Sequence, residues 1–226
     1  MEHKRVTLFA GHYGSGKTNI AVNYAMLLKS EGKNVNIADL DIVNPYFRTK
    51  DSATELREAG IDLISPQYAN SNVDLPALPA EAYRIVEDRN SFSVVDIGGD
   101  DRGAYALGRY VPQLLKENNY RMVFVANCYR PLTRNADEAI EVMREIEEAC
   151  GLKFTDIVNN SNLGNLTDEE TVLDSLDFIN ELSEKTKLPI FMTTAISSLE
   201  KVLSEKINNI LPLHLQAKYF DLPSER

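Results

Sequence analysis

The chain has 226 residues, of which 43% are hydrophobic and 26% are charged, so it can bury a complete core and falls within the size range of one domain. Its formal net charge of −10 repels phosphate backbones and anionic lipids, which argues against nucleic acid and membrane surfaces as partners. The first residues resemble no signal peptide, and no apolar stretch approaches the roughly 20 residues that span a bilayer. We therefore expect one cytoplasmic domain over residues 1–226.

The two cysteines, Cys128 and Cys150, fall in different predicted elements and belong to no CxxC or Cys/His cluster. Their spacing argues against a structural zinc site, an iron–sulfur cluster or a redox pair. We expect thiols without a chemical role.

Apolar strand-like runs alternate with segments of helical period along the chain, the pattern that builds a parallel sheet with helices on both faces. Seven strands are predicted, at residues 6–10, 35–38, 61–65, 93–97, 121–127, 155–159 and 188–194. The predicted helices lie at residues 17–29, 52–59, 79–88, 103–116, 135–149, 168–186 and 199–210. Residues 66–79 are predicted to form the one long irregular loop, and such loops are often functional.

A phosphate-binding pattern, GxxxxGK[ST], follows the first predicted strand and opens the first predicted helix. Its glycines let successive amide groups point into one concavity, at which the helix also directs its positive end. Lys17 is expected to reach the β- and γ-phosphates, and Thr18 to ligate Mg²⁺. The alternative is a chance glycine-rich turn. The predicted nucleotide-contacting residues are Gly11, His12, Tyr13, Gly14, Ser15, Gly16, Lys17 and Thr18.

The pattern and its context predict the α/β fold of P-loop NTPases, with a mainly parallel seven-stranded sheet. Such a fold needs a carboxylate for the metal at the end of a neighbouring strand, where ligands bind in open α/β sheets. Asp96 is the candidate, because it ends the buried run at residues 93–96. The competing interpretation is a charged strand end that faces solvent.

A second acidic group follows the second predicted strand, in the run DLDIVN. Alternation along a strand places Asp39 and Asp41 on one side. Two carboxylates near a phosphate repel it unless a cation is present. We expect Asp39 to support the metal, Asp41 to orient the attacking water, and Asn44 to sense the γ-phosphate. The alternative is a solvated Asp pair before a proline turn.

The motifs GHYGSGKT, DLDIVN and VVDIGG resemble, in this order and spacing, the deviant-Walker-A ATPases of the CobQ/CobB/MinD/ParA nucleotide-binding family, over residues 6–194. The resemblance implies that Lys17 is the phosphate lysine, Thr18 the magnesium hydroxyl, Asp41 the catalytic aspartate and Asp96 the Walker B aspartate. It also implies an ATP-dependent homodimer that closes face to face around two ATP molecules.

One residue departs from this family's pattern. His12 stands where the family has a second lysine, which reaches the partner's nucleotide in the dimer. A neutral imidazole supplies a hydrogen bond but no full charge. Either hydrolysis is slow, or Arg48, Arg102 or Arg130 supplies the missing cation.

The base is expected to meet Asn159 and Asn160, which follow the sixth predicted strand, because amides there pair with a purine edge in similar family members. The alternative is a pair of ordinary loop asparagines. The GTP-type motif NKxD is absent, which favours ATP with Mg²⁺ as the cofactors.

Three functions remain open from the sequence. The first is an ATPase that acts as a nucleotide-driven switch on an unidentified protein client. The second is a small-molecule kinase or amide ligase, with a small-molecule acceptor. The third is a nucleotide sensor with little turnover.

Overall fold

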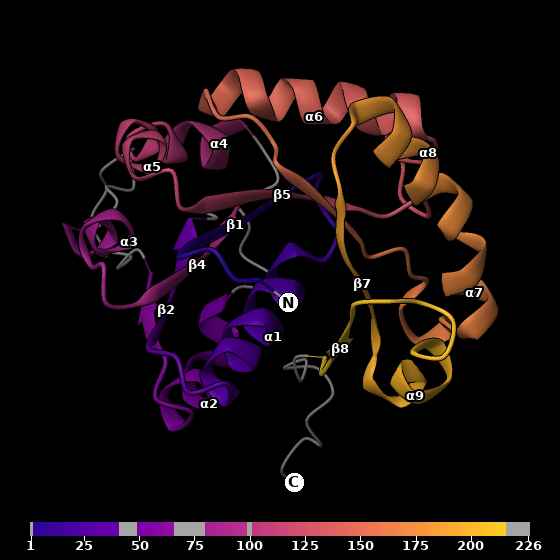
Figure 1. Ribbon diagram of the computed structural model, residues 1–226, viewed down its shortest axis with the longest axis horizontal. Helices are drawn as coiled ribbons and strands as arrows, with labels where there is room; N and C mark the ends of the chain where they lie inside the picture. Colours follow the sequence, from indigo (N-terminus) through magenta and orange to yellow (C-terminus); the bar gives the residue numbers. More distant parts are fainter. Residues whose placement is uncertain (1, 41–48, 66–79, 99–100, 216–226) are drawn as a thin grey trace, which may run out of the picture.

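The computed structural model describes residues 2–40, 49–65, 80–98 and 101–215 (Figure 1). Within these residues eight strands form one parallel sheet in the order β3-β2-β4-β1-β5-β6-β7-β8. The α/β class and the parallel sheet are therefore confirmed. The strands are β1 Val6–Ala10, β2 Val35–Leu40, β3 Asp62–Ile64, β4 Phe92–Ile97, β5 Tyr120–Ala126, β6 Asp156–Asn159, β7 Ile190–Ile196 and β8 Ile210–Leu213.

The helices alternate with the strands along the chain. In the described ranges they are α1 Lys17–Ser30, α2 Ala53–Glu58, α3 Arg84–Glu87, α4 Asp101–Leu107, α5 Val111–Glu117, α6 Ala136–Cys150, α7 Glu169–Asp174, α8 Leu176–Thr186 and α9 Glu200–Leu203. None of them is both long and apolar enough to cross a bilayer.

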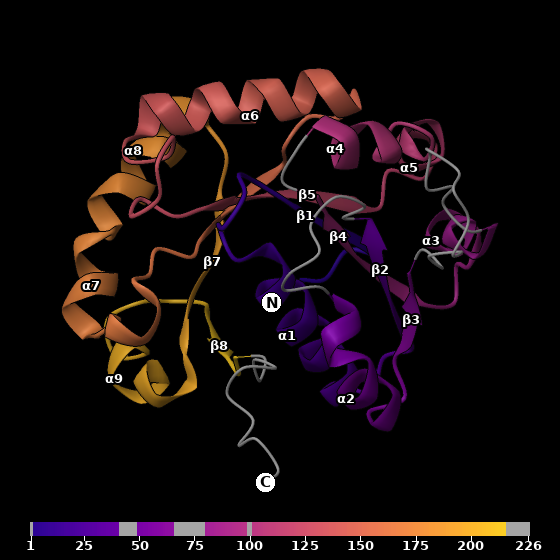
Figure 2. The same cartoon turned by 180° about the vertical axis from the view of Figure 1, so that it is seen from behind.

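Strand β1 lies at the centre of the sheet, and alternate side chains divide its two faces. Val6 and Leu8 join the core that α3 to α6 and α8 cover, whereas Phe9 joins the core beneath α1 and α2. Figures 1 and 2 show this arrangement from opposite sides, with α4, α6 and α8 along one face and α1 and α2 along the other. All five residues of β1 are buried, as a central parallel strand requires.

The eighth strand is a correction to the seven that the sequence predicts, because residues 199–210 were expected to be helical. The helix there is the four-residue α9, and β8 follows it at the edge of the sheet beside β7. In β8 Leu211 and Leu213 are buried while Ile210 and Pro212 are partly exposed, which is the period of a strand. Pro212 cannot donate a ladder hydrogen bond, so an edge position suits it.

Two other long predicted helices are each divided in the structure. The segment predicted as 103–116 forms α4 and α5, and the segment predicted as 168–186 forms α7 and α8. Ser175 lies between α7 and α8, and its buried hydroxyl donates to the carbonyl of Val172. A serine that bonds a nearby carbonyl competes with the helical hydrogen bonds, which accounts for the break.

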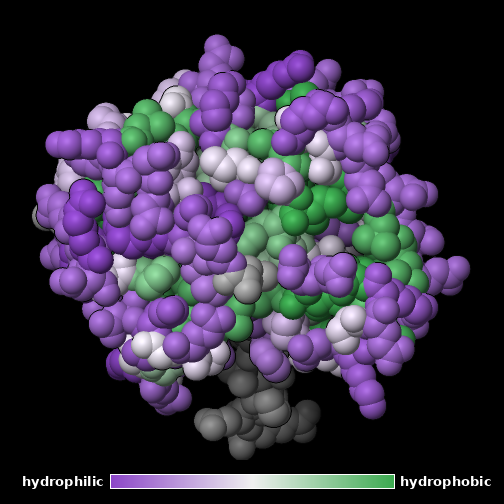
Figure 3. Space-filling model, in the orientation of Figure 1, coloured by the Kyte–Doolittle hydropathy of each residue, from purple (hydrophilic) through white to green (hydrophobic). Residues whose placement is uncertain are grey.

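Hydrophilic side chains dominate the face shown in Figure 3, and apolar ones gather to the right of its centre, over β7. Of the two cysteines, Cys150 is buried and Cys128 is half-buried, and both are free thiols. Burial raises the pKa of both thiols, which keeps them protonated and unreactive.

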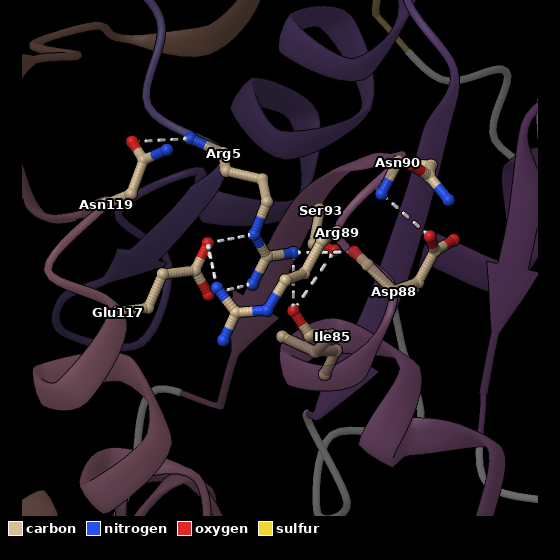
Figure 4. A network of polar contacts seen from close by, with 8 residues as sticks. All are labelled: Arg5, Ile85, Asp88, Arg89, Asn90, Ser93, Glu117 and Asn119. Carbon is tan, nitrogen blue, oxygen red and sulfur yellow. Dashed lines mark hydrogen bonds and ion pairs between the residues drawn. The ribbon is translucent and has the colours of Figure 1, made fainter.

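An ion pair ties β1 to helices on one face of the sheet (Figure 4). The Arg5 and Glu117 side chains are 7% and 8% exposed, and Arg5 Nη2 lies 2.6 Å from Glu117 Oε2. Arg5 Nη1 also donates to the carbonyl oxygens of Ile85 and Asp88, at 3.0 and 2.9 Å. One guanidinium thereby joins the start of β1 to the end of α5, to α3 and to the residue that follows α3.

Glu117→Gln is expected to lower the free energy of unfolding by about 3 kcal/mol, because it leaves the buried Arg5 charge without its carboxylate. Asp62→Asn is the matched control, since it breaks an exposed ion pair with Arg84 and is expected to cost less than about 1 kcal/mol. Urea denaturation at pH 7 measures both. Equal losses in the two variants would contradict the role of Arg5 and Glu117.

The same pair predicts a pH dependence. Hydrogen bonding and charge from Arg5 lower the pKa of Glu117 in the folded chain. The stability that the ionised Glu117 adds to the folded chain is therefore fully present above the unfolded-state pKa of about 4.3. It is lost as the pH falls through the lower folded-state pKa. The stability difference between wild type and Glu117→Gln is expected to shrink in that acid range, which denaturation curves between pH 7 and pH 3 would measure.

Candidate functional site

The loop between β1 and α1 carries the predicted phosphate-binding residues. Gly16 is the N-cap of α1, with a left-handed backbone at φ 93°, and no side chain caps this helix. The amide groups of its first turn therefore face outward with the positive end of the helix dipole behind them. A strand, a glycine-rich loop and a 14-residue helix thus follow one another as an anion site requires.

Two glycines of this loop lie closer to neighbouring elements than a side chain would permit. A Cβ atom at Gly11 would lie 2.7 Å from the carbonyl oxygen of Val125 in β5. One at Gly16 would lie 2.2 Å from Nδ2 of Asn160, which follows β6. The loop therefore rests directly on the ends of two strands, and glycine is needed at both positions.

Lys17 extends back over the loop from the start of α1. The residue is 6% exposed, and its Nζ donates to the carbonyl oxygen of His12 at 3.1 Å. The amide of Ser15 donates to the same carbonyl, at 3.1 Å. The ammonium group is thereby held across the concavity in which an anion would bind.

His12 and Tyr13 lie on the outer part of the loop. The His12 ring nitrogen Nδ1 lies 3.0 Å from the carbonyl oxygen of Tyr13. The Tyr13 side chain is 57% exposed. The imidazole thus bonds within its own loop, and the tyrosine ring is open to solvent or to a partner.

Thr18, Thr49 and Asp96 meet beside the loop. Asp96 Oδ2 accepts hydrogen bonds from the hydroxyls of Thr18 at 2.7 Å and Thr49 at 3.0 Å. Asp96 is 1% exposed, so it is a buried carboxylate rather than a solvent-facing strand end. Register pairs it with Asp39 of β2, which is also 1% exposed, so two carboxylates lie side by side at the ligand edge of the sheet.

These groups suit a hard divalent cation. Hydroxyl and carboxylate oxygens are the donors that Mg²⁺ prefers, and this ion takes few protein ligands, together with waters and phosphate oxygens. Among the described residues, no group of three or more His, Cys, Asp or Glu side chains is placed to hold a metal without such additional ligands. Thr18 and Asp96 therefore fit a magnesium ion that arrives with a nucleotide.

Several predicted site residues fall outside the described part of the chain. Asp41 and Asn44 belong to this group, and so does Arg48. The side chain of Arg102 is likewise not described. The water-orienting and γ-phosphate roles stay predictions.

The two asparagines expected at the base occupy different surroundings. Asn159 is fully buried, and its Nδ2 donates to Ser175 Oγ at 2.9 Å. Asn160 Nδ2 donates to the carbonyl oxygen of Ser15 at 2.6 Å, and its Oδ1 accepts from the hydroxyl of Thr194. Asn160 therefore supports the phosphate loop through a hydrogen bond, while Asn159 connects β6 to the start of α8.

A cavity of about 310 Å³ opens beside the loop and runs across the ends of β6, β7 and β8. The sequence predicts the residues at the P-loop end of this cavity but not most of the residues that line its other end. The only signal there is that each segment follows a parallel strand, so that all reach one edge. The lining residues are Tyr13, Gly14, Gly16, Lys17, Thr18, Asn19, Arg130, Asn160, Asn162, Gly164, Thr167, Thr194, Ala195, Ile196, Leu213 and Leu215.

The chain matches no known protein-family profile and no curated protein sequence. Solved structures with a similar fold include cell division protein FtsY from Thermotoga maritima, with a TM-score of 0.57 and 17% identity over 84% of this chain and 61% of that one. Chloroplast FtsY from Physcomitrella patens gives a TM-score of 0.55 and 17% identity, over 85% of this chain and 59% of that one. The signal recognition particle receptor FtsY from Elizabethkingia anophelis, in complex with GDP, gives a TM-score of 0.52 and 13% identity, over 86% of this chain and 58% of that one.

These likenesses establish the fold, which is that of the P-loop NTPases. The chain spans about three fifths of the length of the structures it matches.

Gly16→Ala is expected to lower the free energy of unfolding by about 2 kcal/mol, because the added Cβ strains a left-handed backbone and collides with Asn160. The Asn160 amide cannot swing away freely, since it is bonded to the loop. Gly14→Ala is the control: its backbone is also left-handed, at φ 76°, but no atom lies within 4 Å of the new Cβ, so about 1 kcal/mol is expected. Chemical denaturation compares them, and equal losses would contradict the close contact.

Proposed function

We propose that this chain binds ATP with Mg²⁺ in the cavity beside the P-loop and acts as a nucleotide-driven switch on a protein client. The observation that carries the proposal is the arrangement of Lys17 over an uncapped helix start. Its ammonium group and the first amides of α1 face one concavity, and such a place favours a polyphosphate.

Different residues of the site bind the phosphates and the metal of the nucleotide. The loop amides and Lys17 bind the phosphates, and the buried Asp96 with the Thr18 hydroxyl holds the metal side. Bound Mg²⁺ would neutralise charge on the β- and γ-phosphates. Asp39 lies next to Asp96 in the sheet and is proposed to support the metal site.

The lining of the cavity favours adenine over guanine. Guanine presents two donors on its pairing edge, which a carboxylate accepts well, and the described lining residues include no Asp or Glu. Adenine presents a donor beside an acceptor, which suits an amide side chain. Asn19 lines the cavity, and Leu213 and Leu215 offer apolar surface for a ring. The side-chain amides of Asn160 and Asn162 line it too but already bond within the chain, so they are not assigned to the base.

Exposed apolar side chains on the surrounding loops support a macromolecular partner at this edge of the sheet. Tyr13 in the P-loop and Leu132 after β5 are each 57% exposed. After β6, Leu163 is 47% and Leu166 80% exposed. With the resemblance to the MinD/ParA-like ATPases, these residues support a switch that closes on a second copy or on a client when ATP is bound.

Lys17→Ala is expected to weaken ATP binding at least about 100-fold, because it removes the ammonium that pairs with the phosphates. Lys116→Ala, an exposed change on α5, is the control and should bind as wild type. Calorimetry with ATP and GTP, with and without Mg²⁺, measures binding. Wild-type protein that takes up neither nucleotide would refute the proposal, and preference for GTP would refute the assignment of the base.

Asp41→Ala is expected to slow phosphate release while leaving ATP binding largely intact, because the proposed role of this carboxylate is to orient water. Phosphate-release assays and calorimetry on the same variant test this, and equal losses of binding and turnover would contradict it.

Size-exclusion chromatography with ATP and Mg²⁺ tests the switch. A dimer that needs ATP supports it, whereas release of ADP only with an added metabolite would favour a kinase or ligase.

A further inference from the structure

Arg130 is a cationic residue that lines the cavity together with the P-loop. It lies in the turn between β5 and α6, and β5 is the direct neighbour of β1. Gly14, Gly16, Lys17 and Thr18 line the same cavity. Among the described lining residues, Lys17 and Arg130 alone carry a permanent positive charge.

The turn that carries Arg130 is held firmly. The Asn127 carbonyl accepts hydrogen bonds from the Thr133 hydroxyl at 2.7 Å and from the Arg130 amide at 3.2 Å. Asn127 Oδ1 accepts from the Tyr129 amide at 3.0 Å. These bonds fix the backbone of Arg130 relative to the end of β5.

The same turn contains an unfavourable backbone conformation. Leu132 has a φ of 68°, in the left-handed region that a bulky side chain rarely adopts. Its side chain is 57% exposed, so core packing does not compensate for this cost. A strained residue in a firmly bonded turn beside a cavity indicates that the position of the turn matters.

The charge of Arg130 has no counter-ion in the described part of the chain. No ion pair within 4.0 Å and no side-chain hydrogen bond involves this arginine there, and its Nε is buried without a partner. A half-buried guanidinium with an unmet donor is costly, and the chain carries 34 acidic residues that could have paired with it. An anion that enters the cavity would supply the missing partner.

We propose that Arg130 is a second phosphate-binding cation of this site, supplied by the same chain that holds the nucleotide; this rests on the proposed binding of a nucleoside triphosphate. His12 does not fill that role, because its ring bonds within the loop. A guanidinium offers paired donors that match two phosphate oxygens, which an ammonium cannot. One copy of the chain thus carries both cations that face the cavity, Lys17 and Arg130, among its described lining residues.

Arg130→Ala and Arg130→Gln test the proposal by calorimetry with ATP, ADP, AMP and inorganic tripolyphosphate. Both variants are expected to weaken binding of ATP and of tripolyphosphate by about 10- to 100-fold, with a smaller effect on AMP, because a lost phosphate contact matters most where charge is highest. Arg130→Lys should recover part of this loss. Arg134→Ala, an exposed change in the same connection between β5 and α6, is the control and should bind as wild type.

Three results would overturn the proposal. Unchanged affinity for ATP in both variants would show that Arg130 makes no such contact. An equal loss for ATP and AMP, with tripolyphosphate unaffected, would place the guanidinium on the base instead. Failure of wild-type protein to bind any of the probes would remove the proposed function as well, so the two failures are distinguishable.

Discussion

At Gly16 the backbone of the phosphate loop passes so close to the Asn160 amide that a Cβ atom would lie 2.2 Å from its nitrogen. The same amide donates to the Ser15 carbonyl, so the contact is also a hydrogen bond that supports the loop. At Gly11 the loop meets β5 in a similar way. These contacts orient the start of α1, and through it Lys17 and Thr18. The remaining features of the site depend on this placement, because an anion cradle works only when its amides and its ammonium group converge.

The two edges of the parallel sheet have different roles. At the start of β1 the buried Arg5–Glu117 pair joins the sheet to α5, to α3 and to the residue that follows α3. Where the strands finish, polar side chains from five strands or their following turns gather around a cavity and a buried carboxylate. This division follows from parallel strands, whose carboxyl ends all lie at one edge. Stabilising interactions at one end leave the other free to carry strained turns and unmet donors.

Charge is distributed unevenly between the chain and its cavity. The sequence as a whole carries −10, yet Lys17 and Arg130 are the charged side chains found among the described lining residues. A local positive field in the cavity of an acidic chain attracts a small polyanion. The proposed function relies on this contrast. Under the proposal, Arg130 in the turn after the neighbouring strand β5 adds a second positive charge beside Lys17.

The sequence by itself predicted the strands up to β7, the phosphate-binding loop and the position of Asp96 at a strand end, because hydrophobic period, glycine spacing and a carboxylate after a buried run are local signals. It predicted single helices where the structure has α4 with α5 and α7 with α8. It did not reveal β8, since a four-residue edge strand with a proline has too weak a pattern. Nor did it separate Asn159 from Asn160 or show that Arg130 lines the cavity. Those distinctions depend on contacts between residues far apart in the chain, such as Asn160 with Ser15 and Asn159 with Ser175. Local patterns determine which elements form, whereas only tertiary packing decides which side chains meet, because strands distant in sequence end side by side at one edge of the sheet.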